Sequence, residues 1–112
     1  MKVIASLLFT FALLTITSFA DDSKFLGTWN TNWGLLVIKQ DEEKITGKYT
    51  GQFEGTIEGK IEEGKLHVTW RQPNAEWGSA VFTVSADGKT LTGTWGGSES
   101  ATNGGEWNGT RE

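Results

Sequence analysis

The residue types that most often perform chemistry are few in this chain and are poorly placed for it. His67 is the only histidine, and the apolar neighbours Leu66 and Val68 give it the solvent side of an alternating segment. The chain has no cysteine and no second histidine, so a catalytic triad or a thiolate or histidine zinc site cannot be assembled. Glu42 and Glu43 occupy a turn, and the strand carboxylates face outward, so no inward carboxylate pair of the glycosidase type is expected. We therefore predict that the protein is not an enzyme and holds no metal or cofactor.

Aromatic side chains are the remaining candidates for a site, because 112 residues include six tryptophans. Tryptophan either supplies buried area to a core or forms a binding surface. The aromatic residues that we expect to face inward and to contact a ligand are Tyr49, Trp70, Trp95 and Trp107. Trp33 and Trp77 each precede a glycine near a hairpin end, and they are candidates for an exposed aromatic platform that binds sugar or peptide.

The elements that must position these residues are predicted from residues 53–61, which alternate almost perfectly between apolar or glycine positions and polar ones. A strand places successive side chains on opposite faces, so this segment has one dry and one wet side. Glycine at every second dry position destabilises a strand unless the backbone bends sharply or another group approaches it closely. A tightly coiled barrel requires the first condition, and a bound ligand requires the second.

The same period of two continues along the chain after Ala20, where no convincing helix is found. Eight strand segments are predicted: 25–30, 34–40, 44–50, 53–62, 65–72, 78–85, 89–96 and 105–111. Their connections are short and rich in Gly, Asn and Asp, and only 72–77 and 97–104 are predicted as real loops. The expected fold is all-β, an eight-stranded antiparallel up-and-down meander that closes, or nearly closes, into a small barrel and so removes its exposed edges.

The alternation also predicts which residues face the barrel interior. The inward side chains are Trp29, Leu36, Ile38, Ile45, Tyr49, Phe53, Ile57, Leu66, Val68, Trp70, Phe82, Val84, Leu91, Trp95 and Trp107. The glycines on the same face are Gly27, Gly47, Gly55, Gly59, Gly93 and Gly109. We expect large aromatics to fold over glycines two residues away, and either to fill the barrel or to line a narrow pocket.

The N-terminus has the features of an export signal. Lys2 precedes an apolar run from Val3 to Ile16, and a small-x-small ending leads to predicted cleavage after Ala20. The apolar run is short for a membrane span, so no stable anchor is expected after cleavage. Residues 1–20 are thus predicted to be a signal peptide, and residues 21–112 a single domain of a secreted or periplasmic protein. The formal charge of −4 and the absence of a basic cluster argue against nucleic acid as a partner.

Both ends of the mature chain carry motifs of a known group. Gly27-Thr28-Trp29, followed by Gly34, resembles the start of the first strand of calycins, the group of lipocalins, fatty-acid-binding proteins and avidins. The resemblance implies a closing contact in which Arg111, from the last strand, packs across Trp29. The residues 27–34, 45–49 and 107–111 are most similar to avidins, and the likeness is weak over 53–90.

The residue set that the avidin resemblance implies for biotin is incomplete. Thr31 and Leu35 stand where that family has an Asn and a Ser, and Gly51 stands where a hydroxyl is expected, although Tyr49 matches a biotin-contacting tyrosine. Losing several buried polar partners, at about 1–3 kcal/mol each, would remove high affinity. The expected function is instead the non-catalytic binding of a small apolar or aromatic ligand at the barrel mouth. The alternative is a protein-interaction module, such as an inhibitor of a secreted hydrolase, that uses its loops and Trp33 or Trp77.

Overall fold

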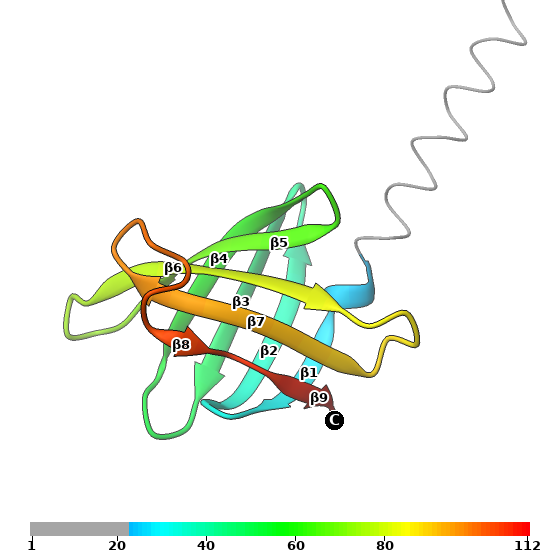
Figure 1. Cartoon of the computed structure of the whole chain (residues 1–112), viewed down its shortest axis with the longest axis horizontal. Coiled ribbons are helices and arrows are strands. Elements are labelled where there is room, and N and C mark those ends of the chain that lie inside the picture. Colours follow the sequence, from blue (N-terminus) through cyan, green and yellow to red (C-terminus); the bar gives the residue numbers. More distant parts are fainter. Residues whose placement is uncertain (1–22) are drawn as a thin grey trace, which may run out of the picture.

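A computed structural model describes residues 23–112, and the predicted signal peptide lies outside the described residues. This part of the chain forms one antiparallel sheet that curves into a barrel (Figure 1). Its elements are a 3-10 helix, η1 (Ser23–Phe25), and the strands β1 (Gly27–Thr31), β2 (Gly34–Asp41), β3 (Lys44–Thr50), β4 (Gly55–Glu62), β5 (Lys65–Arg71), β6 (Trp77–Val84), β7 (Thr90–Gly97), β8 (Gly105–Glu106) and β9 (Gly109–Arg111).

The sheet is closed, and the predicted eight-stranded antiparallel meander is confirmed. Strands β1 to β7 pair in sequence order, and β9 pairs with both β1 and β7, which completes the ring. The predicted eighth segment is divided, because Trp107 and Asn108 interrupt it between β8 and β9. At the interruption the Asn108 side-chain oxygen accepts a hydrogen bond from the Gly93 amide at 3.1 Å, so a side chain replaces the missing main-chain partner.

The predicted inward face forms one buried core, with one exception. The buried apolar side chains are Phe25, Trp29, Leu36, Ile38, Ile45, Tyr49, Ile57, Leu66, Val68, Trp70, Ala80, Phe82, Leu91 and Trp107, while Val84 and Trp95 are partly buried against them. The prediction for Phe53 was wrong, since its side chain is 45% exposed. Strand β4 begins only at Gly55, opposite Tyr49, so Phe53 belongs to a β3–β4 loop that the sequence pattern did not separate from the strand.

Glycine and bulky side chains are paired across neighbouring strands. The register places Tyr49 opposite Gly55, Trp70 opposite Gly78, and Phe82 opposite Gly93. A Cβ atom on Gly55 would lie 2.5 Å from the Tyr49 hydroxyl oxygen, and one on Gly93 would lie 2.5 Å from the Phe82 ring. The aromatic rings therefore cover glycines directly across the ladder, not two residues away along the strand as expected. The glycines provide room for the rings and for close approach of the strands in a small barrel.

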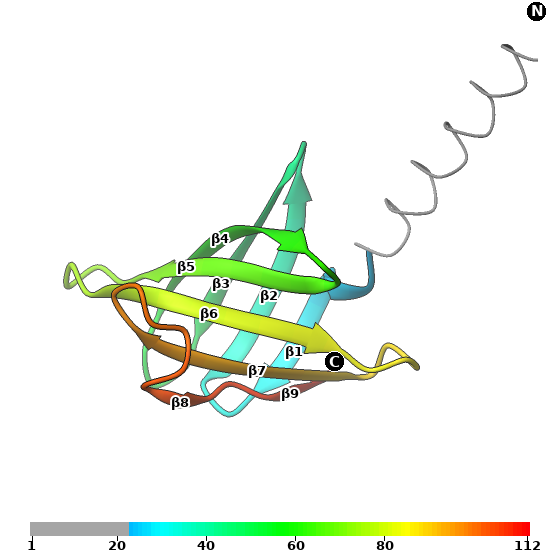
Figure 2. The same ribbon diagram turned by 45° about the horizontal axis from the view of Figure 1, so that its top comes forward.

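The two ends of the barrel differ. The "open end" carries the β1–β2 turn and the β3–β4, β5–β6 and β7–β8 loops, and the "closed end" carries η1 and the turns 42–43, 63–64 and 85–89 (Figures 1 and 2). At the closed end Phe25 is buried, and its carbonyl accepts a hydrogen bond from the Trp29 indole nitrogen at 3.0 Å.

The contact expected between Arg111 and Trp29 is present at the closed end. The guanidinium carbon of Arg111 lies 4.2 Å from the centre of the Trp29 ring. The same guanidinium donates hydrogen bonds to the carbonyls of Leu26, Lys24 and Gly88 at 2.7, 2.7 and 2.9 Å. A Cβ atom on Gly27 would lie 2.7 Å from this guanidinium, which explains why the residue two positions before Trp29 is a glycine. Arg111 thus joins the last strand to the first, to the chain before β1, and to the β6–β7 turn.

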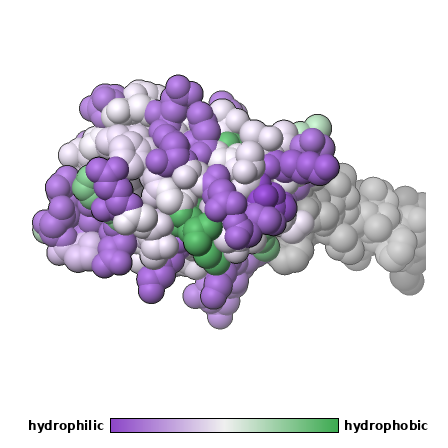
Figure 3. All heavy atoms as spheres, turned by 90° about the horizontal axis from the view of Figure 1, so that it is seen from below, coloured by the Kyte–Doolittle hydropathy of each residue, from purple (hydrophilic) through white to green (hydrophobic). Residues whose placement is uncertain are grey.

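The outer surface is mainly polar. The face seen in Figure 3 is largely hydrophilic or intermediate, with a small hydrophobic area near its middle. Over the described residues, the large apolar side chains that are exposed are Leu35, Phe53 and Trp77. No helix in residues 23–112 is long and apolar enough to cross a membrane.

Candidate functional site

A cavity of about 120 Å³ lies at the open end of the barrel. Six of its eight lining residues are aromatic, and the full lining is Trp33, Tyr49, Phe53, Trp70, Gln72, Glu76, Trp95 and Trp107. Drug-sized ligands occupy pockets of about 300–1,000 Å³, whereas an apolar cavity of about 150 Å³ is sufficient for benzene. The cavity therefore suits a small molecule, or the end group of a larger one.

The rim of the cavity consists of aromatic rings that meet edge to face. Trp95 lies 5.6 Å from Trp33 at an interplanar angle of 89°, and 6.0 Å from Trp70 at 77°. Phe53 contacts Trp33 from its loop at 5.9 Å, with the two rings tilted by 48°. Because these rings are held on a turn, a loop and two strands, their mutual contacts fix the shape of the mouth.

The floor of the cavity is part of the barrel core. Trp107 makes near-perpendicular contacts with Tyr49 and Phe82, at 5.1 and 5.2 Å between ring centres. The indole nitrogen of Trp107 donates to the Thr31 hydroxyl oxygen at 3.1 Å, which fixes the ring. The rings that line the cavity and the rings of the core are therefore one continuous packed group.

The Tyr49 hydroxyl supplies a polar point at the cavity. It accepts a hydrogen bond of 3.1 Å from the Gln72 side-chain amide, and no described residue accepts its own proton. Burial raises the pKa of the Tyr49 phenol above its ordinary value, and the hydrogen bond from Gln72 opposes this shift. The phenol consequently stays protonated at neutral pH and remains available as a donor.

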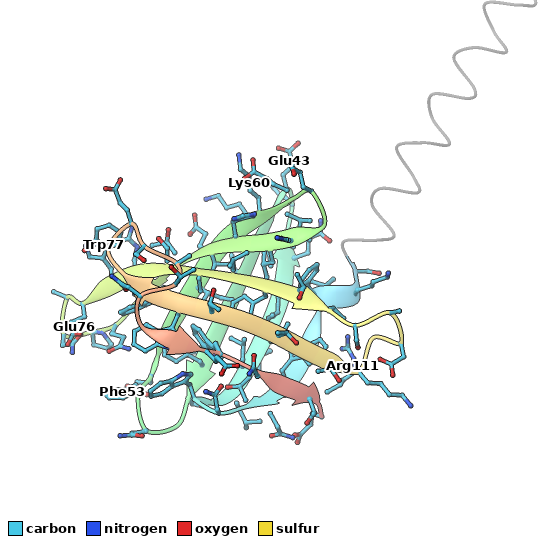
Figure 4. All side chains as sticks on the ribbon, viewed as in Figure 1. Glu43, Phe53, Lys60, Glu76, Trp77 and Arg111 are labelled. Atoms are coloured by element: carbon cyan, nitrogen blue, oxygen red, sulfur yellow. The ribbon has the colours of Figure 1, made fainter. Side chains whose placement is uncertain are left out.

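Glu76 places a carboxylate at the mouth, in the loop between β5 and β6. The loop is closed by a hydrogen bond from the Gln72 amide to the Glu76 carbonyl at 3.0 Å. Asn74 holds Glu76 twice, since its side-chain nitrogen donates to the carboxylate at 2.9 Å and its oxygen accepts from the Glu76 amide at 3.0 Å. Figure 4 shows Glu76 and Phe53 near the open end, and Arg111 at the other end.

The indole nitrogens around the cavity differ in their partners. Trp70 donates to the Gly96 carbonyl at 3.1 Å, and Trp33 donates to the Glu106 carbonyl at 3.1 Å. The Trp95 nitrogen is shielded from water and has no acceptor among the described residues. An unpaired buried donor costs about 1–3 kcal/mol, so Trp95 is held in place by its ring contacts and not by its N–H group.

Five of the six residues predicted to bind a ligand line this one cavity, namely Tyr49, Trp70, Trp95, Trp107 and Trp33. Trp77 does not line it; this residue begins β6 and is 41% exposed. Trp33 instead contacts the rings of Phe53 and Trp95 at the cavity. Sequence reasoning did not identify Gln72 and Glu76 as lining residues, although it did predict a loop at 72–77.

The candidate chemical groups outside the cavity lie on the surface. His67 is exposed on β5, as the alternation predicted. Within residues 23–112, no group of three or more His, Asp or Glu side chains is arranged to hold a metal ion.

The strand order and the cavity at one end are those of a small closed antiparallel β-barrel, which is consistent with a calycin-like fold. Comparisons with protein-family models, with curated proteins and with solved structures gave no match.

Proposed function

We propose that this protein is a non-catalytic binding protein that holds a small apolar or aromatic ligand at the open end of its barrel. The observation that supports the proposal is the cavity of about 120 Å³ with six aromatic lining residues. An apolar ligand gains about 25 cal/mol for each Å² of apolar surface that it removes from water, and preorganised rings lose little entropy when they bind it. The Tyr49 hydroxyl and the Gln72 amide supply the few polar contacts that orient a ligand in such a pocket.

The proposal includes export. The N-terminal pattern of Lys2, an apolar run and a small-x-small ending supports a secreted or periplasmic location. Mass spectrometry of the protein recovered outside the cytoplasm should give a chain that begins at Asp21. A chain that retains residues 1–20 would contradict this part of the proposal.

The proposal also includes a distant calycin relationship, nearest to avidins at the first and last strands and without biotin binding. The Arg111 contact with Trp29 supports the relationship. The residues at the positions that bind biotin in avidins support the absence of biotin binding here. The Thr31 hydroxyl is engaged by the Gly34 carbonyl and the Trp107 indole, and Leu35 is 41% exposed on the outer face.

Tryptophan fluorescence, titrated with a panel of small apolar and aromatic compounds, tests the ligand site. A leucine at Gly55 is unsuitable as a blocking variant, because its Cβ would collide with the Tyr49 hydroxyl and the Arg71 carbonyl. Phe53→Ala is a better variant, since Phe53 is 45% exposed and lines the mouth. Leu35→Ala is the matched control, because Leu35 is similarly exposed but lies outside the cavity lining.

We expect saturable quenching by at least one compound, weakened severalfold by Phe53→Ala and unchanged by Leu35→Ala. If no compound gives saturable quenching, or if both variants weaken binding equally, the cavity is not a ligand site.

A second candidate function is a protein-interaction module, such as an inhibitor of a secreted hydrolase. The exposure of Trp77, next to the loop of the open end, favours it. Inhibition of a panel of secreted hydrolases, lost in Trp77→Ala and retained in Phe53→Ala, would support this function over the first one.

A further inference from the structure

We infer that the ligand class of this cavity is a small organic cation that carries an alkylated ammonium group. The ammonium group enters the cavity between the aromatic rings, and the carboxylate of Glu76 balances its charge. The inference rests on the proposed function and specifies the ligand for the same site. It follows from the charge at the mouth, from the geometry of the rings, and from the size of the cavity.

The charge at the mouth is negative. Of the described residues that line the cavity, Glu76 alone carries an acidic side chain, and no Lys, Arg or His is among them. Both ion pairs in the described chain, Lys44 with Glu58 and Lys60 with Glu62, lie elsewhere, so Glu76 has no cationic partner. Its carboxylate receives a neutral hydrogen bond from Asn74, which positions the charge without neutralising it.

The segments around the open end also carry more acidic than basic side chains. Glu54 lies in the β3–β4 loop and Glu106 in β8, and Arg71 at the end of β5 is the one basic residue in these segments of the described chain. An anionic ligand would therefore be repelled from the mouth, whereas a cation would be attracted to it.

The aromatic rings around the cavity are not parallel to one another. A flat aromatic ligand is best held between parallel rings, but Trp33 and Trp70 stand at 89° and 77° to Trp95. Rings at right angles enclose a rounded group from several sides. The face of an aromatic ring carries negative potential, so such an enclosure attracts a cation that has shed its water, and tryptophan does this best.

The size of the cavity also agrees with this class. A volume of about 120 Å³ is slightly below the cavity of about 150 Å³ that accepts benzene, which leaves room for an ammonium nitrogen with its methyl groups. Methyl groups on the nitrogen supply the apolar surface for the rings, and the spread charge reduces the cost of removing water. A bare ammonium or a metal ion would lack that apolar surface.

Isothermal titration with choline and with its neutral carbon isostere, in which a tert-butyl group replaces the trimethylammonium group, tests the inference. The two compounds share size and shape and differ in charge. We expect choline to bind about tenfold more tightly than the isostere, and added salt to reduce the difference.

Glu76→Gln is the charge variant, since it retains the oxygen that accepts from Asn74. It should weaken choline binding about threefold or more and leave the isostere unchanged. Glu54→Gln removes an exposed carboxylate outside the lining, so it should weaken choline binding less than Glu76→Gln does and leave the isostere unchanged. Phe53→Leu keeps an apolar side chain but removes a ring, and it should weaken choline more than the isostere.

Binding of the isostere as tightly as choline would overturn the cation assignment while leaving the cavity as a ligand site. A failure of choline to bind would also overturn it, and the panel of apolar compounds would then decide separately whether the cavity binds any ligand. Equal losses in Glu76→Gln and Glu54→Gln would show that general surface charge, and not the carboxylate at the mouth, attracts the cation.

Discussion

At the scale of single residues, Tyr49 offers a direct measurement of the environment inside the cavity. It is the only tyrosine of the chain, so the absorbance of ionised tyrosine reports this one side chain. Because burial raises its pKa, an alkaline titration of the folded protein should give a midpoint above the ordinary value of 10.0. Titration in denaturing urea should return the midpoint to that value.

The same shift predicts how stability changes with pH. The folded state binds the proton of Tyr49 more tightly than the unfolded state, so its contribution is fully present below pH 10.0 and is lost as pH rises through the folded pKa. The slope of this loss should be smaller in Tyr49→Phe. A folded-state midpoint at or below that of the unfolded chain would contradict the burial of the phenol.

We expect the same substitution to change stability unequally at the neighbouring tryptophans Trp70 and Trp95. Trp70→Phe removes a hydrogen bond and leaves the Gly96 carbonyl without that donor, whereas Trp95→Phe removes a buried N–H group that has no acceptor. Both changes remove the same ring atoms. Urea unfolding should therefore show Trp70→Phe to be less stable than Trp95→Phe by about 1–3 kcal/mol. Equal losses would mean that the hydrogen bond to Gly96 contributes nothing.

At the scale of elements, β9 is the strand that completes the barrel, and Arg111 holds it. Arg111→Ala removes the contact with Trp29, worth about 1–2 kcal/mol when partly desolvated, together with three hydrogen bonds to carbonyls. For a domain of this size the cation–π contact alone corresponds to a lowering of Tm by at least about 4 °C.

Arg71→Ala is the control for this prediction, because Arg71 is an exposed arginine at the end of β5. Thermal melts followed by circular dichroism should show a clear loss for Arg111→Ala and little change for Arg71→Ala. Equal and negligible effects would show that this arginine does not stabilise the closure.

The elements were largely predictable from sequence because alternation is a local property. The predicted strand ends agree with β1 to β7 within two residues, and the last segment differs by the break at Trp107 and Asn108. The β3–β4 loop was missed because Phe53 and Glu54 continue the alternation after hydrogen bonding to β3 has ended. Side-chain pattern alone does not show where a ladder stops.

The cavity was predictable only in part, because its shape depends on contacts between distant segments. Trp33 and Trp77 have the same local context, a tryptophan before a glycine near a hairpin end. Trp33 turns inward because its ring packs against the rings of Phe53 and Trp95. Both partners are distant in sequence, so the residues next to Trp33 do not predict these contacts. Glu76 reaches the mouth because Asn74 shapes the β5–β6 loop, which composition does not reveal.

At the scale of the whole molecule, the barrel has a single core and no covalent cross-link. One buried cluster includes side chains from η1, from each of β1 to β7 and from Trp107, and the chain has no cysteine. We expect a single cooperative unfolding transition that is unaffected by reducing agents. Far-ultraviolet circular dichroism and tryptophan fluorescence should give the same midpoint in urea. Separate midpoints, or a helical spectrum, would contradict one closed β-barrel.

The pairing of large rings with glycines across the ladder also constrains how such a sequence can evolve. A Cβ atom on Gly93 would lie 2.5 Å from the Phe82 ring and 2.7 Å from the Val81 carbonyl oxygen, and one on Gly78 would lie 2.6 Å from the Trp70 ring and 2.0 Å from the Gly96 carbonyl oxygen. Because main-chain oxygens as well as rings occupy the space at these positions, a smaller residue in place of the ring would not by itself make room for a side chain. Descendants of this sequence should therefore retain glycine at both positions, even where the facing ring is exchanged for another apolar side chain.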